Sequence, residues 1–177
     1  MMNLLKEYDA FLDLTGMNEP QAKNSLRRIF DRDIQNNEAF KFQGKVIRPL
    51  KVDGQASLDT VFGHLTTIRV PVEENGRKFQ RSVFDPHRSI RLHWVKFHID
   101  RGDHEEVEIF SLEERDPVER KDVINTYIYN KDKKYVVVLR PQSSDQDYYL
   151  LTAYYLYEKW GTKEMSKKMK HKLEKVY

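Results

Sequence analysis

The chain has 177 residues, of which 39% are hydrophobic and 33% are charged, with a formal net charge of +3 and no cysteine. This composition is typical of a globular protein with one sizeable core and a heavily charged surface. The absence of cysteine excludes disulfides and thiolate chemistry, and no apolar run reaches the length of a membrane span. We therefore expect a cytoplasmic protein that does not enter a membrane.

Residues 1–59 are predicted to form a mainly helical segment. A first apolar stripe at helical spacing consists of Leu4, Tyr8, Phe11 and Leu12. The stretch Asn18-Glu19-Pro20-Gln21 has the spacing of a capping box and predicts the start of a second helix. The apolar stripe of that helix is Ala22, Leu26, Ile29 and Phe30. Residues 40–59 contain several helix breakers, and a short strand is expected near Lys45 to Ile47.

Residues 60–177 are predicted to form the main domain, which opens with a hairpin of Thr66 to Val72 and Lys78 to Phe84 around an Asn-Gly turn. A helix is then expected up to Ile99, with Asp85 as its N-cap and Pro86 in its first turn. The core stripe of this helix is Ile90, Trp94 and Phe97.

The same helix is predicted to carry His87, Arg91 and His98 near one face, because eleven residues make about three turns. One fixed cation and two groups that titrate near neutrality are the components of acid–base chemistry on a phosphodiester. The simpler interpretation is a basic surface helix whose histidines have no function.

Four consecutive antiparallel strands are expected next: Val107 to Leu112, Val123 to Tyr129, Tyr135 to Leu139 and Tyr148 to Tyr157. A basic helix from about Thr162 closes the chain, with Met165, Met169, Leu173 and Val176 as its buried stripe. The predicted fold class is α+β: N-terminal helices, a helix packed on a four-stranded antiparallel sheet, and a C-terminal helix.

Period two divides the last of these strands into two faces. One face is predicted to carry Tyr148, Leu150, Thr152, Tyr154 and Leu156. One interpretation is that this face forms the wall of a cleft and lines it with hydroxyl groups. The plainer interpretation is that these residue types pack well in strands.

Charge is distributed unevenly along the chain. From Glu158 onward seven lysines and one histidine stand against three acids, whereas residues 100–119 contain nine acids. A basic patch opposite an acidic rim is compatible with an anionic partner such as RNA, and it is equally typical of a solvated helix face.

Three stretches followed by a lysine-rich helix resemble a known family. They are Phe84-Asp85-Pro86-His87-Arg88-Ser89-Ile90-Arg91-Leu92-His93-Trp94-Val95, Tyr135-Val136-Val137-Val138-Leu139-Arg140 and Leu150-Leu151-Thr152-Ala153-Tyr154. Together they look like the phage- and mobile-element-encoded branch of the barnase/EndoU/colicin/RelE-like nucleases, over roughly Val83 to Tyr177. The resemblance implies helices leading into a four-stranded antiparallel sheet, with an active site on one sheet face that cleaves RNA without a metal or other cofactor.

Such cleavage uses the RNA 2′-hydroxyl as nucleophile and needs a base, an acid and cations for the phosphate. The candidate catalytic residues are Arg91, His98, Thr152 and Tyr154. The candidate substrate-binding residues are Arg88, His87, His93, Tyr148, Lys163 and Lys167. His93 is an alternative to His98 as acid or base and His64 a more distant one, so the sequence leaves the base open.

The sequence therefore predicts a toxin-like endoribonuclease, with RNA as substrate and an immunity or antitoxin protein as a candidate partner. The alternative is a non-catalytic phage or mobile-element protein that binds nucleic acid or a protein through its basic helix. No Walker loop or Gly-x-Gly-x-x-Gly segment supports a nucleotide-binding class. The catalytic hypothesis requires Arg91 and Thr152 to converge on one side of the sheet.

Overall fold

The computed structural model describes residues 2–49, 51–52, 55–101, 105–142 and 146–177. Residues 102–104 of the acidic segment and 143–145 of the last hairpin linker therefore lie outside the described residues. The helices are a 3-10 helix Met2–Leu5, α1 Glu19–Phe30, a π-helix Asp31–Gln35, α2 Leu58–Thr66, α3 Pro86–Ser89, α4 Trp94–Asp100 and α5 Lys159–Lys170. The strands are β1 Lys41–Phe42, β2 Lys45–Pro49, β3 Lys51–Val52, β4 Gln55–Ala56, β5 Thr67–Glu74, β6 Arg77–Phe84, β7 Val107–Arg115, β8 Asp122–Asn130, β9 Tyr135–Pro141 and β10 Asp147–Tyr155.

The main sheet has six strands in the order β1-β2-β10-β9-β8-β7, so the predicted four-stranded antiparallel sheet is wrong. The meander β7 to β10 is antiparallel and lies where the sequence predicted strands, but β2 pairs with β10 in parallel. A strand at that position covers the edge that β10 would otherwise expose, which removes a site of edge-to-edge aggregation. Because β1 and β2 come from the predicted segment 1–59, the main sheet includes strands from both sides of residue 59.

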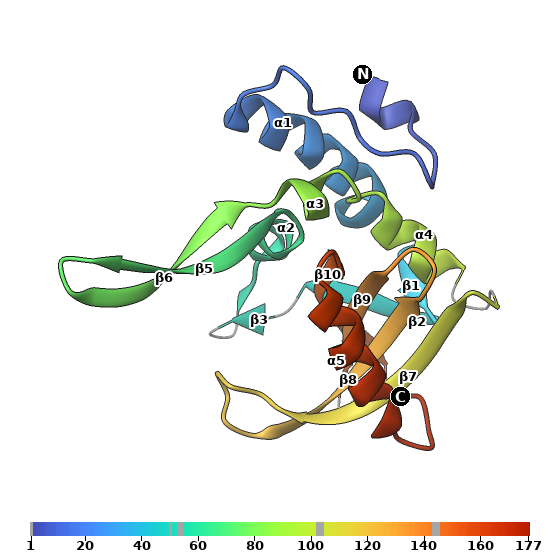
Figure 1. Cartoon of the computed structure of the whole chain (residues 1–177). Coiled ribbons are helices and arrows are strands. Elements are labelled where there is room, and N and C mark those ends of the chain that lie inside the picture. The colour runs from blue at the N-terminus through green and yellow to red at the C-terminus, as the bar shows by residue number, and fades with distance from the viewer. Residues whose placement is uncertain (1, 50, 53–54, 102–104, 143–145) are drawn as a thin grey trace.

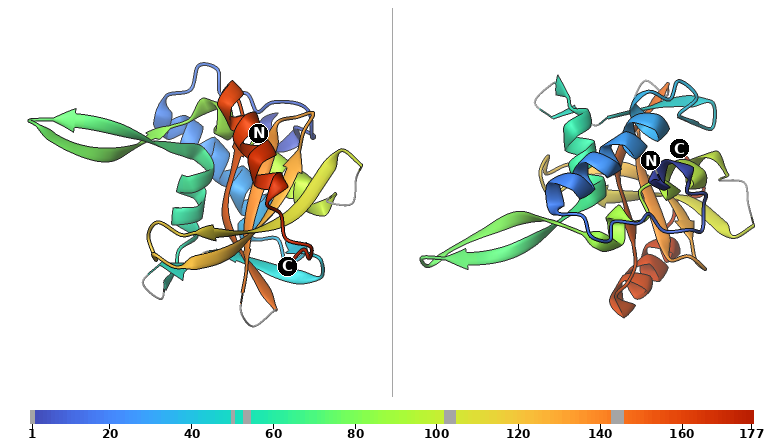
Figure 2. Two further views of the ribbon diagram at one scale, coloured as in Figure 1. Left: turned by 60° about the horizontal axis from the view of Figure 1, so that its bottom comes forward. Right: turned by 90° about the horizontal axis from the view of Figure 1, so that it is seen from above.

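Two hydrophobic clusters cover the two faces of this sheet. Helices α1, α2 and α4 pack on one face, where Leu26, Val61 and Trp94 meet Val137 and Leu139 of β9. Helix α5 packs on the other face, where Met165 meets a second cluster that includes Val136 and Val138. The views of Figure 2 show α1 and α5 on opposite sides of the sheet. The sheet is therefore the middle layer of the body, and α5 crosses in front of it in the view of Figure 1.

The first predicted helix is replaced by a short 3-10 helix and an irregular segment. The Asn3 side chain accepts a hydrogen bond from the Asp13 backbone N–H (2.7 Å) and donates one to the Asp13 carbonyl (2.8 Å), which folds the chain back on itself. Helix α1 is confirmed: Asn18 and Gln21 form both bonds of the capping box, and all four predicted stripe residues are buried. Capping chemistry was therefore a stronger signal than a four-residue apolar stripe.

The predicted continuous helix up to Ile99 is interrupted between α3 and α4. The Ile90 carbonyl accepts a hydrogen bond from the Leu12 backbone N–H (2.9 Å), and the following turn uses i to i−3 bonds such as Leu92 N–H to the Ser89 carbonyl. The interruption changes the phase between the two helices. The predicted alignment of His87 and His98 therefore fails: His87 is exposed, whereas His98 is fully buried.

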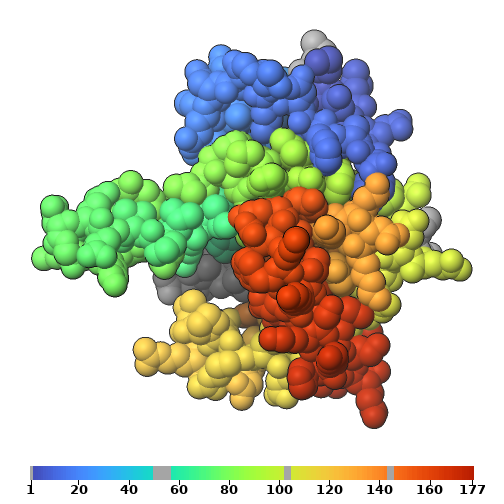
Figure 3. Space-filling model, viewed as in Figure 1, coloured from blue at the N-terminus to red at the C-terminus, as the bar shows by residue number. Residues whose placement is uncertain are grey.

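The strands β5 and β6 form the predicted hairpin, with Asn75 and Gly76 both at positive φ as a two-residue turn requires. This hairpin projects from the body as an arm (Figure 3). The helix α2, which the sequence analysis did not predict, leads into the arm, with Ser57 as its N-cap.

A bulge between Leu150 and Thr152 interrupts the alternation of side chains on β10. Tyr148 and Leu150 pack in the cluster under α1, whereas Tyr154 and Leu156 pack in the cluster under α5. The single face predicted for Tyr148, Thr152 and Tyr154 is therefore wrong, because one extra residue reverses the phase.

Candidate functional site

An open pocket of about 290 Å³ lies between the base of the arm, α3, the end of β10 and the start of α5. Its lining includes two cations, three acids and the rings of Tyr154, Tyr155, Tyr157 and Trp160. The charged lining residues are Arg88, Lys168, Asp85, Glu158 and Glu164. The pocket joins the segments that the sequence analysis singled out, the helix after Asp85, the last strand and the lysine-rich helix.

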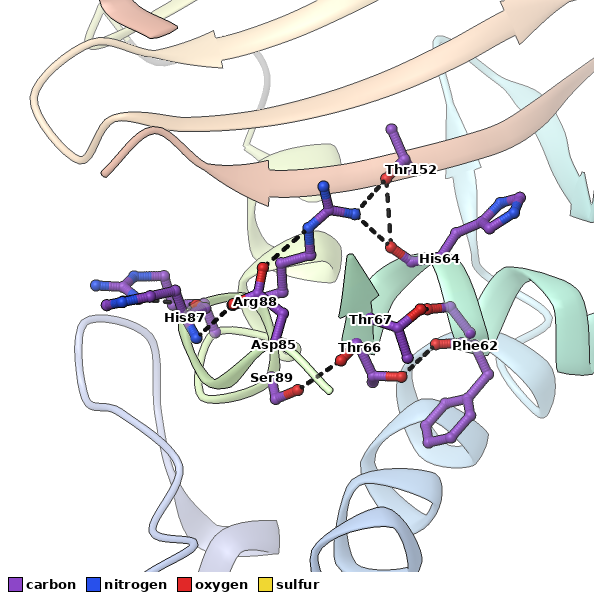
Figure 4. Close-up of polar contacts among 11 residues, drawn as sticks. Phe62, His64, Thr66, Thr67, Asp85, His87, Arg88, Ser89 and Thr152 are labelled. Atoms are coloured by element: carbon purple, nitrogen blue, oxygen red, sulfur yellow. Dashed lines mark hydrogen bonds and ion pairs between the residues drawn. The ribbon is translucent and has the colours of Figure 1, made fainter. Parts of the chain in front are cut away.

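Arg88 is held at the wall of this pocket by three elements of the fold. Its Nη1 donates to the His64 carbonyl (2.8 Å) and to the Thr152 hydroxyl (3.4 Å), and its Nε lies 3.4 Å from Oδ2 of Asp85. Asp85 is itself fixed as the N-cap of α3, where it accepts from the His87 backbone N–H. Figure 4 shows the guanidinium between β10 and α2, with the His64 imidazole pointing away from it. Thr152 therefore contributes to the position of Arg88.

Two hydrogen-bond donors at the pocket have no partner among the described residues. One is Nη2 of Arg88, since Nη1 and Nε make the polar contacts of this arginine to described residues. The other is the hydroxyl of Tyr154, whose ring lies 5.6 Å from the Arg88 guanidinium. Burial, and then the nearby Glu164 carboxylate, raises the pKa of Tyr154 to about 12, so the hydroxyl keeps its proton at neutral pH. Two such donors in the lining of one pocket suit a ligand with acceptor oxygens.

Lys168 and Glu164 lie on α5 at the opposite wall of the pocket. Lys168 forms an ion pair with Glu114 and contacts the Tyr127 hydroxyl at 3.3 Å, so its charge is already partly compensated. Glu164 is exposed and forms no ion pair among the described residues. The sequence analysis missed both residues, although their place in the lysine-rich helix was a usable signal.

Arg91, the predicted phosphate clamp, lies elsewhere. It is 6% exposed, its guanidinium stands 3.7 Å from the ring centroid of Tyr155, and Nη1 donates to the His87 carbonyl. Tyr155 and Tyr154 are neighbours on β10 and pack against opposite clusters. Arg91 and Thr152 consequently do not converge, and Arg88 makes the contact to Thr152 that was expected of Arg91.

Two predicted histidines are part of the core. His98 is fully buried beside Trp94 and Tyr135, its Nδ1 donates to the Trp94 carbonyl (2.8 Å), and its Nε2 has no partner among the described residues. Burial lowers the pKa of His98 to about 4. His93 is 5% exposed, contacts the Glu7 carbonyl through Nε2, and has its pKa lowered by burial. Neither imidazole reaches the pocket.

The remaining predicted residues are divided between surface and core. His87 is exposed on α3 and stacks on Tyr157, with centroids 4.8 Å apart. Lys163 and Lys167 are exposed on α5 but do not line the pocket. Tyr148 is fully buried, and its hydroxyl donates to the Tyr177 carbonyl (2.8 Å). The sequence analysis also missed Trp160, which is 65% exposed, although a tryptophan outside the Met stripe of a polar helix was visible.

No protein-family model matches the chain, and no curated protein or solved structure matches it significantly. Among the residues that the structure describes, no group of three or more His, Asp or Glu side chains is arranged to hold a metal ion. None of the described helices has the length and apolarity that a membrane crossing requires.

Proposed function

We propose that the chain is a metal-independent endoribonuclease whose reaction takes place in the pocket of Arg88 and Tyr154. The observation that carries this proposal is the pair of donors without protein partners, Nη2 of Arg88 and the Tyr154 hydroxyl, at the wall of one open pocket. Charge-assisted and hydroxyl donors in the lining of one pocket suit the oxygens of a phosphodiester.

The proposed reaction uses the 2′-hydroxyl of the substrate as its nucleophile. Glu164 accepts the proton of that hydroxyl, and the oxygen attacks the adjacent phosphorus to form a 2′,3′-cyclic phosphate. Arg88 stabilises the negative charge of the transition state, since a guanidinium stays protonated at any physiological pH. Tyr154 gives a proton to the departing 5′-oxygen, a role that its retained proton supports.

The test is cleavage of a mixed RNA pool in EDTA by the wild type, Tyr154→Phe and Glu164→Gln. Tyr154→Phe removes only a hydroxyl that has no partner among the described residues, so we expect an unchanged melting temperature. Loss of one donor used in the transition state should lower the rate about a hundredfold, or about 3 kcal/mol. The matched control is Tyr149→Phe, on the same strand but outside the pocket lining, which should cleave like the wild type.

Wild-type protein that cleaves none of a varied set of RNAs would contradict the enzymatic proposal. The alternative of a non-catalytic protein that binds nucleic acid or a protein partner would then take its place. Equal cleavage by wild type and Tyr154→Phe would instead contradict the assignment of this pocket. As a toxin-like ribonuclease of a phage or mobile element, the protein would act in the cytoplasm, and an immunity or antitoxin protein would need to cover this pocket.

A further inference from the structure

Beside the pocket, a series of ring contacts runs from the N-terminal segment through Arg91 to α3 and the end of β10. The Arg91 guanidinium lies 4.6 Å from the ring centroid of Phe11 and 3.7 Å from the ring centroid of Tyr155. The His87 ring follows, 6.2 Å from Tyr155 and 4.8 Å from Tyr157. We call this series, together with Trp160, which also lines the pocket, the stacking strip: Phe11, Arg91, Tyr155, His87, Tyr157 and Trp160. The strip joins the N-terminal segment, α3, β10 and α5.

Three rings of the stacking strip are open to solvent. Phe11 is 49% exposed, Tyr157 47% and Trp160 65%. Large aromatic side chains contribute most when they are buried, and this strip leaves much of their surface in contact with water. Neighbouring exposed rings at the mouth of a pocket are therefore more informative than the same rings scattered singly over a surface.

Cations lie near the strip, and the pocket beside it also has the acids Asp85, Glu158 and Glu164 in its lining. Arg91 forms no ion pair among the described residues, although it is 6% exposed, and its Nε has no hydrogen-bond partner there. Lys163 and Lys167 follow Trp160 by three and seven residues on α5, so helical spacing puts all three near one face. Both lysines are exposed. Rings with cations beside them match a strand of nucleic acid, which has flat bases and a phosphate backbone.

We propose that the stacking strip binds unpaired bases of single-stranded RNA and leads the strand into the pocket. Phe11, Tyr157 and Trp160 stack on bases, and Lys163 and Lys167 contact backbone phosphates. Base-paired RNA does not fit this description, because its bases are stacked on one another and offer their faces to no side chain. The inference rests on the proposed function, since the pocket supplies the reacting groups, and it names the substrate class as unpaired RNA in loops, ends or linkers.

The test is binding of a labelled 2′-O-methyl RNA, which cannot be cleaved through the 2′-hydroxyl, followed by fluorescence anisotropy. The single strand should bind more tightly than the same strand in a duplex and than an abasic oligomer of equal length. Tyr157→Ala and Trp160→Ala should each weaken binding of the single strand about tenfold, because stacking on one ring contributes at least that factor. The conservative variants Tyr157→Phe and Trp160→Phe should bind nearly as the wild type does.

The matched control is Phe79→Ala on β6 of the arm, because Phe79 is 40% exposed and lies outside the strip. Equal affinity for the duplex or the abasic oligomer, or equal losses in Phe79→Ala and Trp160→Ala, would overturn the inference. The outcome separates the two proposals. Binding that depends on the rings, in a protein that cleaves no RNA, would contradict only the reaction, whereas cleavage with ring-independent binding would contradict only the stacking strip.

Discussion

Two groups of aromatic side chains lie near the interruption between α3 and α4, and they differ in how far their rings are buried. The buried aromatic cluster consists of Trp94, His98 and Tyr135 with the half-buried Tyr8 and Phe97, and it packs between α4 and the sheet. The ring centroids of Tyr8 and Phe97 lie 3.4 Å apart and those of Trp94 and Tyr135 5.5 Å apart. The stacking strip lies on the other side of the interruption and leaves half of the Phe11 and Tyr157 surface in water.

Each group contains a histidine, and its surroundings decide what that histidine can do. His98 is buried beside the rings of Trp94 and Tyr135, so its neutral form is favoured. His87 stands at the surface against Tyr157, where solvent can reach it. The comparison teaches that clustering of histidines in the sequence did not indicate a shared role, because one interruption of the helix separates core from surface.

The largest effect should come from the buried aromatic cluster. Trp94 is 2% exposed, as the sequence predicted, and its indole N–H reaches the Ala10 carbonyl at 3.4 Å. Trp94→Ala should lower the free energy of unfolding by about 3–5 kcal/mol, because the cavity adds to the lost burial. Chemical denaturation measures the loss. Trp160→Ala, in the exposed group, should change stability by less than about 0.5 kcal/mol. Equal losses in the two variants would remove the distinction between the groups.

The next effect is a dependence of stability on pH. The unfolded chain takes up a proton on His98 near pH 6.5, whereas the folded protein resists it until the pH falls to about 4. The free energy of unfolding should therefore decrease as the pH falls from 6.5 to 4, by about 3 kcal/mol for this residue. Denaturation at several pH values measures this, and His98→Gln should remove most of the dependence.

The control for the pH effect is His87→Gln, which changes an exposed imidazole of the stacking strip. It should retain the wild-type pH dependence. His93 is also buried, and its lowered pKa adds a loss of the same sign, so some dependence should persist in His98→Gln. A profile that is the same in wild type and His98→Gln would show that the folded protein admits the proton without cost.

Local patterns in the sequence predicted much of this fold. The capping box of α1, the Asn-Gly turn of the arm and the strands β7 to β10 each follow from neighbouring residues. The parallel pairing of β2 with β10, the bond from Leu12 to the Ile90 carbonyl and the bulge after Leu150 each depend on distant residues or on one irregular residue. Local periodicity carries no information about such features.

The sequence predicted only part of the candidate site, because residue types are visible locally whereas the positions of side chains depend on distant contacts. Arg88 and Tyr154 were singled out because their residue types suit a phosphate, and the structure brings them together at one pocket. Arg91 and His98 were placed by extending helical phase across the interruption, which moved them to the wrong surroundings. Trp160 was not predicted, because the exposure of a tryptophan at the start of a helix depends on tertiary packing that helical periodicity does not determine.

Arg91 connects the two groups, since its guanidinium also lies 5.4 Å from the Trp94 ring. The sequence predicted Arg91 as a catalytic residue that converges with Thr152, but the structure shows this side chain packed between Phe11 and Tyr155. Arg91→Ala should therefore lower the free energy of unfolding by about 1–2 kcal/mol, through lost cation–π contacts and packing. Thermal or chemical denaturation measures this smallest of the three stability effects.

Arg91→Met shows whether the charge or the stem of Arg91 supports the fold. Methionine fills the space between the two rings and removes a buried charge that has no ion pair among the described residues. Replacement of a buried charge by a well-packed apolar side chain is often neutral or stabilising, so Arg91→Met should be more stable than Arg91→Ala. If the charge serves the stacking strip, Arg91→Met should bind single-stranded RNA more weakly than wild type while it folds as well. A variant that loses stability and keeps binding would assign Arg91 to the buried aromatic cluster.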